Sequence, residues 1–198
     1  MMAKREGRKL SSHGKSLADM AGSGDDGSSG LLGGGRVSKA DQRMEACGAL
    51  DEVSSALGLA RSLISDGDVR ALIESFQRDM YRMGAELATT DVRAGKFGSM
   101  SRPDVERLEQ HLRQIESQTP IGRDFILPGE SSGSAALDLA RAVVRRAERE
   151  VVRLGGQRSA SNPEVARYLN RLSLLLFVLA RYVELQAGRS APVARTSA

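Results

Sequence analysis

The pattern of apolar residues constrains the fold of this chain most. From residue 40 onward, apolar residues recur every three or four positions in five separate stretches. This spacing gathers apolar side chains on one face of an α-helix, whereas a half-buried strand would alternate them. The stretches lie at about 40–65, 67–89, 101–118, 131–155 and 163–187, separated by short breaks containing Pro, Gly and Ser. We therefore expect an all-α fold, an up-and-down bundle of five helices.

Two of these helices carry informative details. Helix 131–155 has a predicted inward seam of Ala136, Leu139, Val143, Ala147 and Val151. Helix 163–187 has a wider apolar arc, which predicts a central helix, and Asn170 within that arc must hydrogen-bond a neighbouring helix or a ligand. Cys47 lies on the apolar face of the first helix with no His nearby, so we interpret it as a core residue rather than a nucleophile.

The positive charge of the chain is concentrated at its ends. The formal net charge is +4 with a pI near 9.6, but residues 1–20 carry +3 and residues 186–198 carry +2, which leaves −1 for the body. The body also lacks an aromatic platform on which bases could stack. We therefore do not expect a nucleic-acid partner.

Metal chemistry of the di-iron type is excluded by the histidines. Such a site in a helical bundle needs inward Glu-x-x-His pairs. The two histidines are His13, in the N-terminal segment, and His111, on a polar helix face. We expect no metal held by protein side chains alone.

We expect the two ends of the chain to be flexible. Residues 1–20 form a basic arm without the apolar core of a secretory signal, and residues 188–198 form a tail. No apolar run approaches the roughly 20 residues that cross a bilayer, so no membrane association is expected. A single Cys suits a reducing compartment. We expect a cytoplasmic protein, or one of an organelle matrix if the basic arm is a transit peptide.

The segment 21–39 is rich in Gly and Ser and shows neither helical nor strand periodicity. One interpretation is a flexible linker. The other is a loop that approaches a phosphate closely, since glycines permit such contact and since Asp25, Asp26, Arg36 and Lys39 have no purpose in a plain spacer. Composition alone leaves both interpretations open.

Arg141, Arg145 and Arg149 recur every four residues on helix 131–155 and so share one side of it. Like charges at this spacing repel one another unless an anion offsets them. The row is either a solvated face, neutralised in part by Glu148 and Glu150, or a polyanion site, because guanidinium groups match phosphate oxygens.

The loop 119–130 carries the apolar run Phe125-Ile126-Leu127 between Pro and Gly residues. Ordinary surface loops rarely expose such a run. It is either packed under the bundle or part of a binding surface.

Five motifs together resemble one family. They are GDDGSSGLLGGGRVSK (24–39), ALDEVSSALGLAR (49–61), FILPG (125–129), LARAVVRRAER (139–149) and YLNRLS-LLFVLARY (168–182). In this order and spacing they are similar to the PduO-type ATP:cob(I)alamin adenosyltransferases, over about residues 20–185. The resemblance implies a homotrimeric five-helix bundle with active sites between subunits. It also implies transfer of the 5′-deoxyadenosyl group of ATP to cob(I)alamin, with release of triphosphate.

The resemblance also implies roles for individual residues. One subunit would contact ATP through Gly24, Ser29, Gly30 and Lys39, and its neighbour through Arg145, Arg146, Glu148, Arg149 and Asn170. Mg²⁺ would bridge the phosphates. Arg145 would act in catalysis, and Asp51 and Arg141 would form a salt bridge across the subunit interface. Phe125 would lie at the lower face of the corrinoid, displacing its axial base and favouring four-coordinate Co(II).

The chain departs from the family pattern at several positions. Ala21 and Gly22 stand where a threonine and an arginine are usual, Glu130 replaces a glycine, and Asp138 and Leu174 replace a histidine and an aspartate. We expect weaker ATP binding from the lost phosphate contact. An alternative function is a weakly active or non-catalytic homologue that delivers adenosylcobalamin to a partner enzyme. An enzyme of the family would also need a reductase as electron source.

Overall fold

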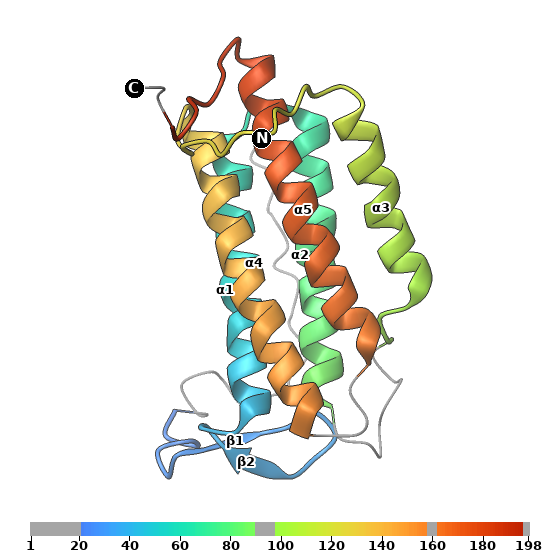
Figure 1. Ribbon diagram of the computed structural model, residues 1–198. Coiled ribbons are helices and arrows are strands. Elements are labelled where there is room, and N and C mark those ends of the chain that lie inside the picture. Colours follow the sequence, from blue (N-terminus) through green and yellow to red (C-terminus); the bar gives the residue numbers. More distant parts are fainter. Residues whose placement is uncertain (1–20, 90–97, 158–161, 196–198) are drawn as a thin grey trace, which may run out of the picture.

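A computed structural model describes residues 21–89, 98–157 and 162–195, and these form five long helices and a small hairpin (Figure 1). The helices are α1 (Gln42–Leu63), α2 (Gly67–Ala88), α3 (Arg102–Glu116), α4 (Ser132–Gln157) and α5 (Pro163–Gln186). The hairpin consists of β1 (Ser28–Gly30) and β2 (Arg36–Ser38). The predicted five-helix bundle is confirmed. The basic arm 1–20 lies outside the described residues.

Polar residues fix where the helices begin. Asp41 accepts a hydrogen bond from the backbone N–H of Arg43 at the start of α1, and Asp66 accepts one from Val69 at the start of α2. Asn162 caps α5 and is followed by Pro163 at the first helical position. These are the side chains that satisfy the free N–H groups of a first turn.

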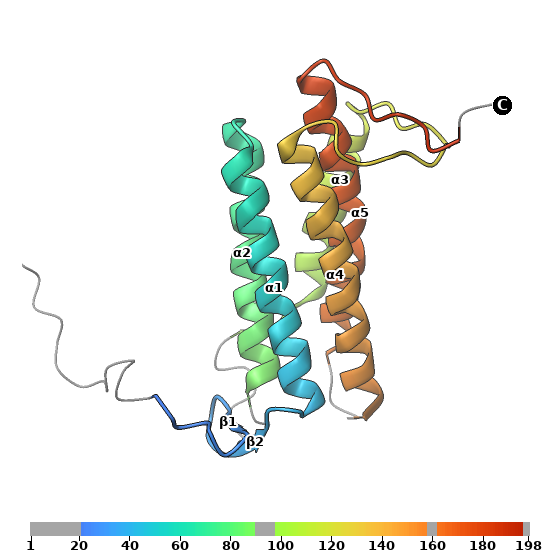
Figure 2. The same ribbon diagram turned by 90° about the vertical axis from the view of Figure 1, so that its left-hand side faces the viewer.

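The core lies among the apolar faces of the bundle. α1 packs against α2 and α4, and α5 packs against α4 and α3. The pairs α1–α2, α1–α4 and α4–α5 are antiparallel, whereas α3 and α5 run in the same direction (Figures 1 and 2). Leu50, Leu57, Phe76, Tyr168 and Leu172 are among the fully buried side chains. Cys47 is half-buried, and burial, with a smaller contribution from Asp51, raises the pKa of its thiol to about 11. A thiol of this kind is unreactive at neutral pH.

The seam of α4 differs from the prediction. Ala136, Ala147 and Val151 are buried as expected, but Leu139 is 53% exposed. The buried row instead includes Leu137, Ala140, Val144, Ala147, Val151 and Leu154. α4 packs between α1 and α5 and therefore buries two adjoining rows of side chains, and Leu139 lies outside both. Periodicity alone does not show which of two overlapping rows faces inward.

The glycine-rich segment forms a hairpin rather than an irregular loop. Ser28 pairs with Ser38 and Gly30 with Arg36 in an antiparallel register. The turn between the strands contains Gly33, Gly34 and Gly35, each with φ near +80° to +110°, a region that other residues rarely adopt. Gly and Ser have low strand propensity, which explains why no strand is predicted for this segment.

The hairpin is attached to the end of α2. The backbone N–H of Leu32 donates to the carbonyl of Ala88 (2.9 Å), and Arg43 Nη1 of α1 donates to the carbonyl of Thr89 (2.6 Å). The first bond, with the Leu32–Thr89 bridge, holds the hairpin against one end of the bundle (Figure 2), and the second joins α1 to the residue at which α2 ends. The linker interpretation of this segment is therefore wrong.

The chain beyond α5 pairs with the loop that precedes α4. The N–H of Leu127 donates to the carbonyl of Pro192 (2.8 Å), and the N–H of Ala194 donates to the carbonyl of Phe125 (2.6 Å). Ile126 and Val193 form an antiparallel bridge between these bonds. Residues 192–194, which we expected in a flexible tail, thus pair with the Phe125 loop.

Candidate active site

α4 presents a row of arginines on its outward face. Arg145 and Arg149 are exposed, and Arg149 Nη1 donates to the carbonyl of Arg145 (2.9 Å). Among the described residues, nothing forms an ion pair or a hydrogen bond with the Arg145 guanidinium. Arg145 and Arg149 are two positive charges one turn apart, and Arg145 has no ion-pair partner in the described part of the chain, so this face attracts an anion.

The two flanks of this row are attached to the neighbouring helices. On one side, Arg146 forms a salt bridge with Glu52 of α1. On the other side, Asn170 of α5 donates its side-chain N–H to Glu148 Oε1 (3.0 Å) and accepts a hydrogen bond from Arg171 (2.8 Å). The prediction that Asn170 hydrogen-bonds a neighbouring helix is confirmed. These contacts hold α4 so that the row between them faces outward.

The hairpin brings Gly24 and Lys39 together. A side chain at position 24 would place its Cβ 3.0 Å from Lys39 Nζ and 3.0 Å from the carbonyl oxygen of Ser28, so only glycine fits without displacing its neighbours. Ser29 and Gly30 lie beside them in β1. The backbone N–H of Lys39 also donates to the carbonyl of Gly27 (2.8 Å).

Arg36 holds the hairpin loop in shape. Its Nε donates to Ser28 Oγ (2.7 Å), and its Nη2 donates to the carbonyls of Ser23 and Ser28. Asp26 accepts bonds from the N–H and Oγ of Ser28, and these bonds, more than Arg36, lower the pKa of its carboxyl. Asp26 and Arg36 therefore have a structural role within the loop.

A small pocket of about 150 Å³ lies between the hairpin and the bundle. Lys39 lines it from the hairpin side, Glu52 from α1, and Arg146 and Glu150 from α4. Gln42 donates to Glu150 (2.8 Å), and this bond, with one from Arg153, lowers the pKa of the Glu150 carboxyl. Glu52 and Glu150 were not among the predicted site residues, because nothing in the sequence indicates which carboxylates α1 and α4 turn toward the hairpin.

Asp51 and Arg141 do not pair within one chain. Arg141 Nε lies 3.5 Å from Asp138 Oδ1 on its own helix. Asp51 is exposed on α1 and forms no ion pair among the described residues. Their predicted salt bridge therefore requires a second copy of the chain.

Phe125 is 89% exposed. The loop that carries it, between α3 and α4, lies at the end of the bundle opposite the hairpin (Figure 1). Its loop is held by residues 192–194 rather than by the helices. The interpretation of Phe125 as an anchor packed under the bundle is therefore wrong, and the exposed ring fits a binding surface.

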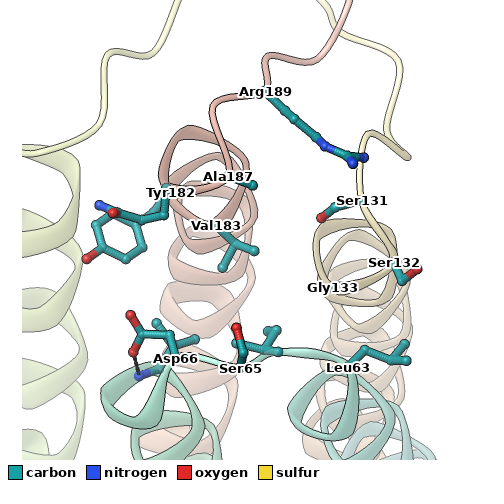
Figure 3. A pocket seen from close by; sticks show the side chains of 13 residues that line it. Leu63, Ser65, Asp66, Ser131, Ser132, Gly133, Tyr182, Val183, Ala187 and Arg189 are labelled. Carbon is teal, nitrogen blue, oxygen red and sulfur yellow. Dashed lines mark hydrogen bonds between the residues drawn. The ribbon is translucent and has the colours of Figure 1, made fainter.

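A second pocket of about 420 Å³ lies at the same end as the Phe125 loop (Figure 3). The turn between α1 and α2, the start of α4 and the end of α5 surround it, and Tyr182, Val183 and Ser131 are among its lining residues. It contains none of the predicted site residues. Its lining comes from three separate segments of the sequence, which left no local motif by which it could be predicted.

Comparison with known proteins shows the family. The family described as cobalamin adenosyltransferase matches residues 20–183. The chain belongs to the cobalamin adenosyltransferase family. It is therefore a corrinoid adenosyltransferase, an enzyme that transfers an adenosyl group from ATP to a corrinoid.

Several relatives of this adenosyltransferase are similar over most of their length. The cobalamin adenosyltransferase of Cupriavidus metallidurans is 39% identical over 171 residues, which cover 84% of this chain and 88% of the relative. A corrinoid adenosyltransferase of Citrobacter freundii is 34% identical over 162 residues, which cover 81% of this chain and 92% of the relative.

Solved structures of the family are similar in fold. A variant of the PduO-type ATP:corrinoid adenosyltransferase of Lactobacillus reuteri, complexed with cobalamin and ATP, matches with a TM-score of 0.82 and 30% identity. The match covers 89% of this chain and 98% of that one. Another variant, complexed with ATP, matches with a TM-score of 0.82 and 29% identity, covering 88% and 99%.

In residues 21–89, 98–157 and 162–195, no three His, Cys, Asp or Glu side chains gather where they could bind one metal ion. No helix in this part of the chain is long and apolar enough to span a bilayer.

Proposed function

We propose that this adenosyltransferase works as a homotrimer and transfers the adenosyl group at sites shared between two copies of the chain. The observation that carries this proposal is the exposed Arg145 of α4, whose guanidinium forms no ion pair or hydrogen bond with any residue that the structure describes. Hydrogen bonds at Glu148 and Asn170 hold the row in place without using Arg145. A bound triphosphate supplies the missing negative charge.

An exposed apolar patch supports the assembly. Leu59 and Leu63 of α1 are 48% and 47% exposed, and Leu139 of α4 is 53% exposed. α1 and α4 run in opposite directions, and Arg146 of α4 pairs with Glu52 of α1. Seven residues, about two turns, before Arg146 is Leu139, and seven residues after Glu52 is Leu59. Leu139 and Leu59 therefore also lie opposite each other. An apolar patch of this kind beside a charged site is typical of a covered surface.

The chemistry requires positioning and charge stabilisation rather than a general base. Co(I) is itself a strong nucleophile and donates an electron pair to C5′ of ATP. The Co–C5′ bond forms while the C5′–O bond breaks, and the bonding electrons leave with the triphosphate oxygen, so cobalt is formally oxidised from +1 to +3. The protein holds C5′ in line with cobalt and stabilises the triphosphate leaving group.

We assign the triphosphate to Arg145 and Arg149, with Arg146 and Lys39 at its far end. Gly24, Ser29 and Gly30 form the hairpin wall, where the absence of a side chain at position 24 leaves Lys39 accessible. From Arg145 to Ser132, at the Phe125 end of α4, the helix rises about 20 Å. The nucleotide would therefore run along α4 with its ribose directed toward the corrinoid at Phe125.

Mg²⁺ fits this arrangement as a partner of the phosphates. Because the described residues provide no three-ligand cluster, the ion would take most of its ligands from phosphate oxygens and water, as Mg²⁺ commonly does. When bound, it neutralises part of the triphosphate charge. Glu148 lies beside the arginine row and could orient a magnesium-bound water.

The direct test is an anaerobic assay with chemically reduced cobalamin, ATP and Mg²⁺, in which the loss of cob(I)alamin absorbance is followed. We expect conversion that depends on both ATP and protein. Retained cobalamin binding without ATP-dependent conversion would instead support the carrier function. The reductase that supplies Co(I) and the adenosylcobalamin-dependent enzyme that receives the product would then be sought as binding partners.

A further inference from the structure

Four charged side chains form a row of alternating sign from the interior of α5 to the surface of α4. Arg181 Nε and Nη2 donate to the two oxygens of Glu184 (2.7 and 2.9 Å), and Nη2 also donates to Asp138 Oδ2 (2.7 Å). Asp138 Oδ1 then faces Arg141 Nε at 3.5 Å. Arg181 also lies 5.4 Å above the ring of Phe177. Glu184, Arg181 and Asp138 are all buried or nearly so.

The orientation of Arg141 follows from which of its atoms are buried. Its Nε is fully buried and has no hydrogen-bond partner, yet the side chain as a whole is 35% exposed. The exposed part of the guanidinium is therefore the end that carries the terminal nitrogens. Asp138 lies on the buried Nε edge, at ion-pair distance but beyond a good hydrogen bond.

Charge balance within the cluster indicates that the orientation of the Arg141 guanidinium depends on Asp138. The charge of Arg181 is already compensated by Glu184, to which it donates two hydrogen bonds. The second negative charge, on Asp138, is balanced only when Arg141 lies beside it. Without Asp138, the Nε edge of Arg141 would be buried near the positive Arg181 with no negative group between them, and the guanidinium would turn outward.

We infer that Asp138 is a positioning residue that holds the Nε edge of Arg141 so that its terminal nitrogens face outward to bind Asp51 of a second copy. This inference rests on the proposed shared site. It also connects the interface to the buried contact between α4 and α5, because the carboxylate that holds Arg141 also binds Arg181.

The test of positioning is the solvent exchange of the Arg141 Nε–H, measured by NMR with ¹⁵N-labelled arginine. In the wild-type chain we expect a protected proton. Asp138→Asn keeps the shape but removes the charge, and the exchange should become at least roughly fivefold faster. The matched variant Glu184→Gln removes a charge from the same cluster without touching Arg141, and should leave this proton protected. Equal exchange in wild type and Asp138→Asn would overturn the inference.

Turnover provides the second readout through a double-mutant cycle. We expect Asp138→Asn to lower kcat/KM roughly tenfold in the wild-type background and less than twofold in the Arg141→Ala background. If Asp138→Asn lowered kcat/KM by the same factor in both backgrounds, Asp138 would have a structural role only. If Asp138→Asn does not fold, Asp138→Glu, which moves the charge by one methylene, takes its place in both measurements.

These readouts separate the inference from the proposed function. If the wild-type chain shows no adenosylation, the proposed function fails, while the exchange measurement still decides whether Asp138 holds Arg141. If the wild-type chain is active but the cycle is additive, only the inference fails.

Discussion

The arginines of α4 differ in how the fold uses them. Arg146 is bound to Glu52, and Arg141 to Asp138, so each contributes to the contacts of α4 within the chain. Arg145 contributes no such contact among the described residues. Its side chain can therefore be removed at little cost in stability, which makes it the best position at which to separate catalysis from folding.

We expect Arg145→Ala to lower kcat by at least roughly a hundredfold, because a positive charge that stabilises the leaving triphosphate is lost. The melting temperature and the oligomeric state should stay unchanged. Arg153→Ala removes an exposed arginine from the same helix and should retain activity. Normal turnover of Arg145→Ala in steady-state assays would refute its assigned role.

Phe125→Ala should lower the rate of adenosylation by different factors depending on the oxidation state of cobalt at the start. If the ring displaces the axial base and favours four-coordinate Co(II), its loss should slow the reaction from Co(II) more than the reaction from pre-reduced Co(I). Leu127→Ala, which shortens another exposed side chain of the same loop, serves as the control. Equal rate losses from both oxidation states would contradict the placement of Phe125 at the lower face.

Among single residues, the site side chains that share a local sequence pattern were predictable, whereas those brought together only by packing were not. The spacing of Arg141, Arg145 and Arg149 predicts their common face, and the apolar surroundings of Asn170 predict its hydrogen bond. Glu52, Glu150 and Arg181 were missed, because their partners are distant in sequence and because charged residues are ordinary on helix surfaces.

Among the elements, α3 packs on α5 through the buried Val105 and Leu108, and ion pairs join it to α2. Arg82 of α2 binds Asp104 at the start of α3 (3.0 Å), and Arg107 of α3 binds Asp79 of α2 (2.6 Å). The hydroxyl of the buried Tyr168 also donates to Asp79 (2.6 Å). Burial opposes ionisation of Asp104, but bonds from Arg82 and Ser101 outweigh it and hold the pKa of Asp104 well below its usual value.

We expect Asp104→Asn to lower the free energy of unfolding by about 2 kcal/mol at pH 7, because the buried carboxylate loses its charge-assisted bonds to the half-exposed Arg82 and Arg107. A carboxyl with a lowered pKa stabilises the fold above its unfolded pKa, near 3.8, and this contribution is lost as the pH falls further. The difference between variant and wild type should therefore shrink below about pH 4 in urea unfolding. Asp124→Asn, at an exposed position, should show little difference at either pH.

Gly133→Ala should destabilise the contact between α4 and α1. Alanine favours a helix over glycine by about 1 kcal/mol, but the added Cβ would lie 2.9 Å from Ile64 Cγ1. We expect a net loss of about 1–2 kcal/mol in chemical denaturation. Gly84→Ala, where no atom lies within 4 Å of the added Cβ, should instead gain up to about 1 kcal/mol. A gain at both positions would show that α1 yields to the new methyl group.

The elements themselves were predicted from periodicity with their ends within a few residues, because capping residues and Pro mark the ends directly. Two features were not predictable in this way. The hairpin depends on glycine turns and on bonds to the end of α2, and the register of α4 depends on having two neighbours rather than one. Both are properties of packing, to which the local sequence contributes little.

At the scale of the whole molecule, mixing variants shows which copy supplies which residue. We expect Lys39→Ala and Arg145→Ala, inactive alone, to regain activity when co-assembled at equal amounts. If hairpin and α4 come from different copies, about one quarter of the sites then contain both wild-type residues. The alternative is a site within one chain, because Lys39 and Arg146 of the same chain line one pocket. In that case every site of the mixed assembly would keep a defect, and activity would not return.

The control for this mixture is the pair Arg145→Ala and Arg149→Ala. Both residues lie on α4, so every site in the mixed assembly keeps one defect, and activity should not return. Recovery in this control would show exchange of α4 itself between copies, and would contradict the proposed division of the site.

α4 begins directly after the Phe125 loop and carries the arginine row about 20 Å further along. Each residue of a helix adds about 1.5 Å of length and 100° of rotation. One residue inserted or deleted between Ser132 and Arg145 would therefore turn the arginines away from the site as well as shift them. Between these two positions, a functional relative can therefore change side chains but not their number.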